Sequence, residues 1–121
     1  MLNCGMKKFV VMYRVPVEMM KKWREETPEA KMKAQGEKLG KEMMAWIGAH
    51  KNSIVDMGLP LGKNTRMTMS GAQPETNDLN YYQVIEAESV EDVVVMLKDN
   101  PHVQIPQAFL DIMEVSHMEL S

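Results

Sequence analysis

Phe9-Val10-Val11-Met12-Tyr13-Arg14-Val15 is the stretch of sequence that decides the fold. In a strand, successive side chains point to opposite faces, so Phe9 and Val11 face one way while Val10 and Met12 face the other. Both faces are apolar, whereas a strand with one face in water alternates apolar with polar residues. The stretch therefore predicts a strand that is covered on both sides.

Helices and further strands follow this strand. Pro16 ends it, and the next helix has Met20 and Trp23 as its inward-facing candidates. Gly71 is one of the markers of a loop over 70–78. From such signals and from apolar periodicity, we expect strands over 9–15, 53–57, 65–69, 80–87 and 108–115, and helices over 17–26, over 28–50 and from the capping box at 89–92 to Asn100.

The helix over 28–50 is the longest expected element. Its apolar stripe recurs at helical spacing and consists of Met32, Leu39, Met43, Trp46 and His50. Glycine inside a helix costs about 1 kcal/mol relative to alanine. Gly36 and Gly40 lie near the stripe, which predicts that this helix approaches another backbone closely there. We expect it to lie flat on the sheet.

The order of the elements predicts the fold class. Strand, helix pair, two strands, strand, helix and strand is close to βαββαβ, an α+β ferredoxin-like split βαβ sandwich, with one extra hairpin strand and its helices on one face. The opposite face of the sheet would be exposed although its strands are apolar. An identical subunit is the simplest cover, so we expect a face-to-face homodimer.

Length and composition suit one domain over residues 1–121 with a single core. Cys4 is the only cysteine, so no intramolecular disulfide can form, and the Cys/His spacing of a structural zinc site is absent. No apolar run reaches the roughly 20 residues that cross a bilayer. We therefore expect a cytoplasmic protein with no metal and no membrane contact, in which residues 1–5 are a frayed extension.

Charge is distributed unevenly along the chain. Nearly all Lys and Arg lie in residues 1–66, whereas residues 67–121 are rich in Asp and Glu and contain one base, Lys98. The basic residues alternate with Glu on the expected helices, as in Lys38 and Glu42, a spacing typical of solvated ion pairs. Because the whole chain is also acidic, with a net charge of -3, we expect no nucleic-acid partner.

A rigid turn follows the strand over 53–57. In Asp56-Met57-Gly58-Leu59-Pro60-Leu61-Gly62 the glycines permit backbone angles that other residues avoid, and Pro60 fixes φ. The turn holds the Asp56 carboxylate in place, either to bind a ligand or act as a general base, with Gly58 and Pro60 beside the ligand. Alternatively, Asp56 accepts hydrogen bonds from the backbone amides of its own turn.

Several segments together resemble one known family. They are Val-Asp-Met-Gly-Leu-Pro at 55–60, Pro-Glu-Thr at 74–76, Tyr-Tyr-Gln-Val-Ile-Glu-Ala at 81–87, Ser-Val-Glu at 89–91, and Asn-Pro-His at 100–102 before a final strand with Glu-Val at 114–115. Over roughly residues 40–116 the chain resembles the YCII-related (YciI-like, DGPF-type) proteins. The resemblance implies a dimeric ferredoxin-like α+β barrel with a pocket beside the sheet. Most members of that family have no established activity.

The same resemblance bears on catalysis. In the YciI-like branch a His/Asp pair has been proposed as catalytic, with the histidine near the start of the first helix. Residues 23–33 contain no histidine, so that pair is not reproduced. His102 matches the Pro-His position of other relatives, which leaves Asp56 and His102 as catalytic candidates. A loop histidine can act as acid or base near neutral pH; the alternative is a solvated or backbone-bonded side chain.

Three other residues are candidates for ligand binding. Arg14 is on the same face of its strand as the apolar residues Val10 and Met12. A charge on such a mostly buried face requires an anion, either a ligand carboxylate or a protein partner such as Asp111. Tyr13 and Tyr82 either orient a ligand through their hydroxyls or pack in the core.

Two main functional hypotheses remain. The sequence has no phosphate-binding glycine loop, His-rich set or recognisable nucleophile arrangement, which disfavours cofactor-dependent catalysis. The first hypothesis is a non-catalytic dimer that binds a small organic ligand in a cavity lined by Met and Tyr. The alternative is a cofactor-free isomerase or lyase for a small organic acid, with Asp56 or His102 as base and Arg14 or a tyrosine as anchor. A purely structural interaction protein is a third hypothesis if no cavity exists.

Overall fold

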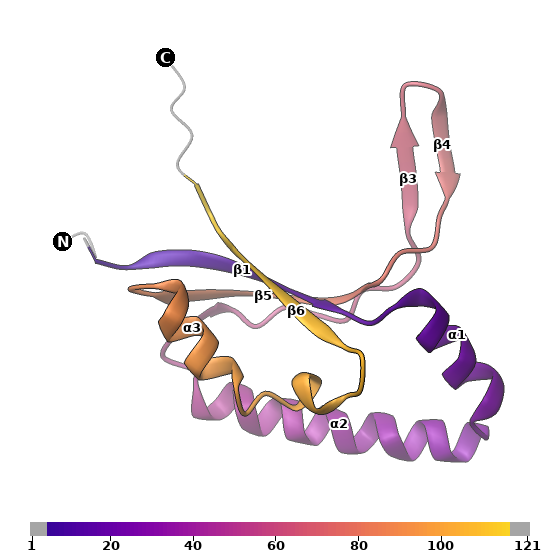
Figure 1. Cartoon of the computed structure of the whole chain (residues 1–121), viewed down its shortest axis with the longest axis horizontal. Helices are drawn as coiled ribbons and strands as arrows, with labels where there is room; N and C mark the ends of the chain where they lie inside the picture. The colour runs from indigo at the N-terminus through magenta and orange to yellow at the C-terminus, as the bar shows by residue number, and fades with distance from the viewer. Residues whose placement is uncertain (1–4, 117–121) are drawn as a thin grey trace.

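A four-stranded antiparallel sheet forms the centre of the molecule (Figure 1). The computed structural model describes residues 5–116. The strands of the sheet, in spatial order, are β2 (Ile54–Asp56), β5 (Leu79–Ala87), β1 (Lys7–Arg14) and β6 (Phe109–Glu114). The helices are α1 (Val17–Glu26), α2 (Glu29–Ala49), α3 (Val90–Leu97) and the short 3-10 helix η1 (Pro101–Gln104). The predicted mixed α+β fold is confirmed.

Burial alternates along β1 between the two sets of side chains that the sequence assigns to opposite faces, and cover on both faces stays a prediction. Phe9, Val11 and Tyr13 are buried, while Val10 and Met12 are only half-buried. The buried set joins residues from β5, α2 and α3 in one core cluster. Its members outside β1 are Trp46, Ile47, Ile85, Ala87, Val93 and Leu97. The core therefore lies between the sheet and the C-terminal part of α2 together with α3.

Helix α2 packs on the core at one end only. Its two buried residues, Trp46 and Ile47, lie near its C-terminus. The prediction that Gly36 and Gly40 permit a close backbone approach is wrong, since a Cβ at either position would meet nothing within 4 Å. The N-terminal half of α2 therefore does not lie flat against the sheet, and space remains beside it.

A second, two-stranded sheet consists of β3 (Thr65–Thr68) and β4 (Gly71–Pro74). The prediction of a loop over 70–78 is wrong for the four residues of β4. β3 pairs with β4 and not with β2. Both strands are exposed along their whole length, and the hairpin projects to the side of the sheet opposite the helices (Figure 1).

The other face of the main sheet carries apolar side chains. Val10 is paired with Val84 and Met113, and Met12 is paired with Tyr82, so these residues share that face. Met113 is 44% exposed. Within residues 5–116 all three α-helices lie on the opposite side (Figure 1). We call the surface formed by Val10, Met12, Tyr82, Val84 and Met113 the open face.

Two expectations concern the ends of the chain and membranes. Of the residues expected to fray, 1–4 lie outside the described part of the structure. Among the helices within residues 5–116, none has the length and apolar character needed to cross a membrane.

Candidate functional site

The glycine-proline turn is attached to the central strand by backbone contacts. The amide of Gly58 donates to Oδ1 of Asp56 over 2.9 Å, which is the turn-bonding alternative considered for this carboxylate. The Tyr81 hydroxyl donates to the carbonyl of Met57 over 2.6 Å, and Pro60 forms a β-bridge with Tyr81. Gly58 and Pro60 therefore have structural roles in holding the turn on β5.

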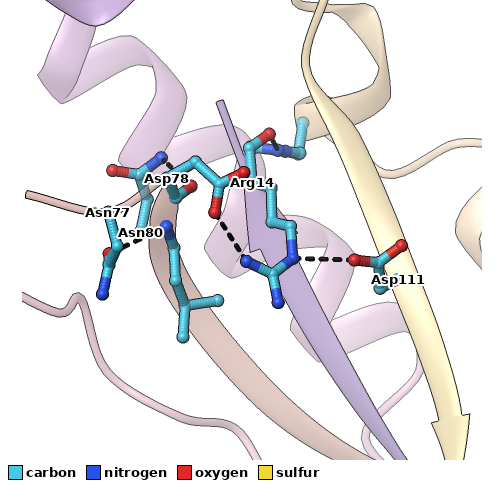
Figure 2. Close-up of polar contacts among 7 residues, drawn as sticks. Arg14, Asn77, Asp78, Asn80 and Asp111 are labelled. Atoms are coloured by element: carbon cyan, nitrogen blue, oxygen red, sulfur yellow. Dashed lines mark hydrogen bonds and ion pairs between the residues drawn. The ribbon is translucent and has the colours of Figure 1, made fainter. Parts of the chain in front are cut away.

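Arg14 is held between two carboxylates (Figure 2). Its Nη1 donates to Oδ1 of Asp78 over 2.6 Å and its Nε donates to Oδ2 of Asp111 over 2.7 Å. The hydrogen bond that Arg14 donates to Asp78 is the main cause of the raised pKa of Arg14. The arginine thus joins the loop before β5 to β1 and β6. Asp111 was the protein partner predicted for it, and these two carboxylates satisfy the requirement for an anion without a ligand.

Tyr13 lies in the core. Its hydroxyl donates to Oε1 of Gln83 over 2.5 Å and accepts from Nδ2 of Asn100 over 2.9 Å. Burial raises the pKa of Tyr13 far above its ordinary value, so the hydroxyl keeps its proton as a donor. The side chain is 1% exposed. Tyr13 therefore packs in the core and does not orient a ligand.

A cavity of about 510 Å³ lies between α1, α2 and η1. Its apolar walls come from both helices and from the segments that flank the sheet. They include Val15, Met19, Met20, Trp23, Leu39 and Ile105. We call this space the α1 cavity. It lies along the part of α2 where Gly36 leaves open space.

Helix α1 forms because an apolar stripe at helical spacing, with Met19, Met20 and Trp23, lies between two chain-breaking prolines. The residue before Pro28, Thr27, is extended, as a following proline requires, and it ends the helix. None of the residues of α1 is buried. Its one side-chain hydrogen bond to α2 runs from Trp23 Nε1 to Gln35 Oε1 over 2.9 Å. The apolar side of α1 thus faces the cavity instead of a filled core.

His102 forms part of the wall of the α1 cavity. Asn100 caps η1 by accepting from the amide of His102 over 2.9 Å, which fixes the start of the turn. The Nε2 atom lies 3.0 Å from the carbonyl oxygen of Arg14. A carbonyl can only accept, so this hydrogen bond requires a proton on Nε2. Burial is the main cause that lowers the pKa of His102, and its imidazole is therefore neutral at pH 7.

The structure does not bring all the candidate residues together. His102 lines the α1 cavity, whereas Asp56 is on β2, an edge strand of the sheet, and is not part of the cavity wall. Tyr82 lies on the open face, and Arg14 and Tyr13 also lie outside the wall. Within residues 5–116 no group of three or more His, Cys, Asp or Glu side chains is placed to hold a metal ion.

Several cavity residues were not proposed as site residues from the sequence. Met20 and Trp23 were assigned only an inward direction on their helix, and Gly36 was assigned to close packing. The one signal available was that two glycines near the stripe of α2 leave room beside it. That signal does not distinguish a close neighbour from an empty space.

The chain matches no protein-family model, and none of the curated proteins matches it. The resemblance to the YCII-related proteins therefore stays a prediction.

Proposed function

We propose that this protein binds a small organic molecule in the α1 cavity. The observation that carries the proposal is a helix, α1, that presents an apolar stripe to about 510 Å³ of space and buries none of its own residues. Ligand sites of roughly 300–1,000 Å³ with mostly apolar walls are common in proteins. A ligand in this cavity would give Met19, Met20 and Trp23 the contacts that the protein core does not provide.

Binding is better supported than catalysis. A general base must reach the proton it removes from a bound substrate. Asp56 is not in the cavity wall, and its Oδ1 accepts from the turn. The Nε2 atom of His102 is bound to the Arg14 carbonyl. Of the two alternative bases, only His102 thus lines the cavity, and neither Arg14 nor a tyrosine lies in its wall as an anchor. The isomerase or lyase hypothesis is therefore the weaker one.

Filling the cavity is the direct test of binding. Gly36→Phe is expected to weaken the binding of an apolar fluorescent probe, N-phenyl-1-naphthylamine, at least about tenfold, a change of about 1.4 kcal/mol. Gly36 lines the cavity and a Cβ there meets nothing within 4 Å, so the added ring enters the space without a clash at its base. Replacing a helical glycine also favours the helix. Fluorescence titration measures the affinity.

Gly40→Phe is the matched control, because Gly40 lies one turn further along α2, also has open space around it and does not line the cavity. This variant should bind the probe like the unmodified protein. Equal affinities for all three proteins, or no binding to any of them, would contradict the proposed function. Circular dichroism checks that both variants keep the helical content of the unmodified chain.

We also propose that the fold is the ferredoxin-like split βαβ sandwich and that two copies form a dimeric α+β barrel through their open faces. The strand order β2-β5-β1-β6 with two helical crossovers supports the first part. The second part is supported by the paired apolar residues Val10, Val84 and Met113 on a face that no helix of residues 5–116 covers.

The dimer predicts about twice the 13.8 kDa chain mass in light scattering. Met113→Asp should shift the protein to the monomer mass, because it would place an unpaired charge within the interface. Met44→Asp is the control, since Met44 is an exposed residue on the helix side of the molecule. A monomer mass for the unmodified protein at micromolar concentration, or a dimer that survives Met113→Asp, would overturn the arrangement.

A further inference from the structure

We propose that the ligand of the α1 cavity is an uncharged, largely apolar molecule of about the size of two fused rings with one substituent. This inference rests on the proposed binding function and specifies the chemical class of the ligand. It follows from three features of the wall: the kind of apolar side chains, the balance of charge and the space available.

The apolar contact surface is suited to rings. Trp23 is a flat aromatic residue that lines the cavity, and its indole N–H is already bonded to Gln35, so its contact with a ligand is apolar. Met19 and Met20 are unbranched and polarizable, and thioethers make favourable contacts with aromatic rings. Both methionines lie on α1, which is held by few contacts, so their side chains can adapt to the outline of a ring system.

The charged residues of the wall are Lys38 and Glu42, and their opposite charges lie in water. Lys38 and Glu42 are one helical turn apart, with 4.0 Å between Nζ and Oε1, and their side chains are 81% and 48% exposed. Their charges are opposite and lie at the mouth, in contact with water. An ionised ligand group inside the cavity would lose its hydration without gaining a counter-charge, which is strongly unfavourable.

The inner polar groups are also neutral. The imidazole of His102 is neutral, and its Nε2 atom is hydrogen-bonded to the Arg14 carbonyl. Arg14 itself is paired with both Asp78 and Asp111, so its charge is not free for an anion, and it does not line the cavity. The wall also contains the amide side chains of Asn80, which is half-buried, and of Gln104, which is exposed. Amides can accept or donate one or two hydrogen bonds to a neutral substituent.

The size of the ligand follows from the volume. About 510 Å³ lies within the range of pockets that bind drug-sized molecules. The cavity is bounded by α1, α2 and η1. A two-ring aromatic body with one substituent fits within this volume.

A pair of probes with one skeleton tests the charge of the ligand. N-phenyl-1-naphthylamine is uncharged, and 8-anilino-1-naphthalenesulfonate adds one sulfonate to the same rings. We titrate each probe into the full chain and count only the fluorescence that Gly36→Phe removes and Gly40→Phe retains. The uncharged probe is expected to bind at least about tenfold more tightly, because the sulfonate has no counter-charge inside the cavity.

The outcomes separate this inference from the proposed function. If both probes bind with equal affinity, or the sulfonate binds more tightly, while Gly36→Phe still removes the signal, the cavity binds ligands but the assignment of an uncharged class is wrong. If Gly36→Phe removes no signal from either probe, the binding function itself fails. If the uncharged probe binds tenfold more tightly but Gly36→Phe does not weaken its binding, the probe binds outside the cavity. That result would also contradict the inference.

Discussion

Replacing Gly58 with alanine is expected to lower the free energy of unfolding by about 3 kcal/mol or more. Gly58 has a φ of +73°, a conformation that residues with a Cβ adopt at a cost. A Cβ at this position would lie 1.5 Å from the carbonyl oxygen of Tyr82. That oxygen belongs to the backbone of β5, which pairs with β1 and β2, so it cannot rotate away. Urea unfolding followed by circular dichroism measures the loss.

The same turn contains its own control. Gly62 is four residues further along, has no positive φ, and a Cβ there would meet nothing within 4 Å. Gly62→Ala should therefore change the stability by no more than about 0.5 kcal/mol. Equal urea midpoints for the two variants would mean that the turn does not approach β5 as closely as the structure shows.

The elements of the main sheet could be predicted from the sequence because their pattern reflects burial. β1 alternates two apolar sets, and the structure buries Phe9 and Val11 while leaving Val10 and Met12 half-buried. The serine predicted to cap α3, Ser89, accepts from the amide of Asp92 over 3.2 Å. Caps and periodicity are local, so one sequence is sufficient to find them.

Only one strand of the β3–β4 hairpin was predicted from the sequence, since a strand was expected over 65–69 and a loop over 70–78. Residues 65–68 and 71–74 are exposed on both faces, so burial imposes no alternation on them. Gly71 and Pro74 are strong loop signals, yet Gly71 begins β4 with a φ of +127° and Pro74 ends it. The hairpin is defined by pairing between two short strands, which leaves little trace in composition.

The candidate site was predicted only in part, and for a physical reason. The strand face that Arg14 occupies predicted an anionic partner such as Asp111. Its other partner, Asp78, was not predicted, because it lies in a loop whose position depends on the whole fold. His102 was selected and it does line a cavity. A cavity lined by Met and Tyr was predicted, but its position between α1 and α2, with no tyrosine in its wall, was not. An apolar stripe on a helix shows which side faces inward and not whether that space is filled. Gly36 illustrates this point, since the same residue would suit a close contact or a void.

Tyr13→Phe is expected to lower the free energy of unfolding by about 2–4 kcal/mol. The change keeps the ring in the core and removes only the hydroxyl that lies between Gln83 Oε1 and Asn100 Nδ2. Both amides are on fully buried side chains, and each buried polar atom left without a partner costs about 1–3 kcal/mol. Water has no access to replace the lost bonds. The urea midpoint and slope give the change.

Tyr82→Phe is the matched control for this network. It removes the same hydroxyl group from a tyrosine on β5. Within residues 5–116 the Tyr82 hydroxyl has no hydrogen bond. Its stability should change by no more than about 0.5 kcal/mol. A small effect at both tyrosines would mean that the buried amides re-pair with each other when the hydroxyl is removed. A large effect at Tyr13 alone shows that the hydroxyl joins β1 and β5 to the segment that carries His102. In that case the wall of the α1 cavity depends on a hydrogen bond in the core, and Tyr13 supports the site without contacting a ligand.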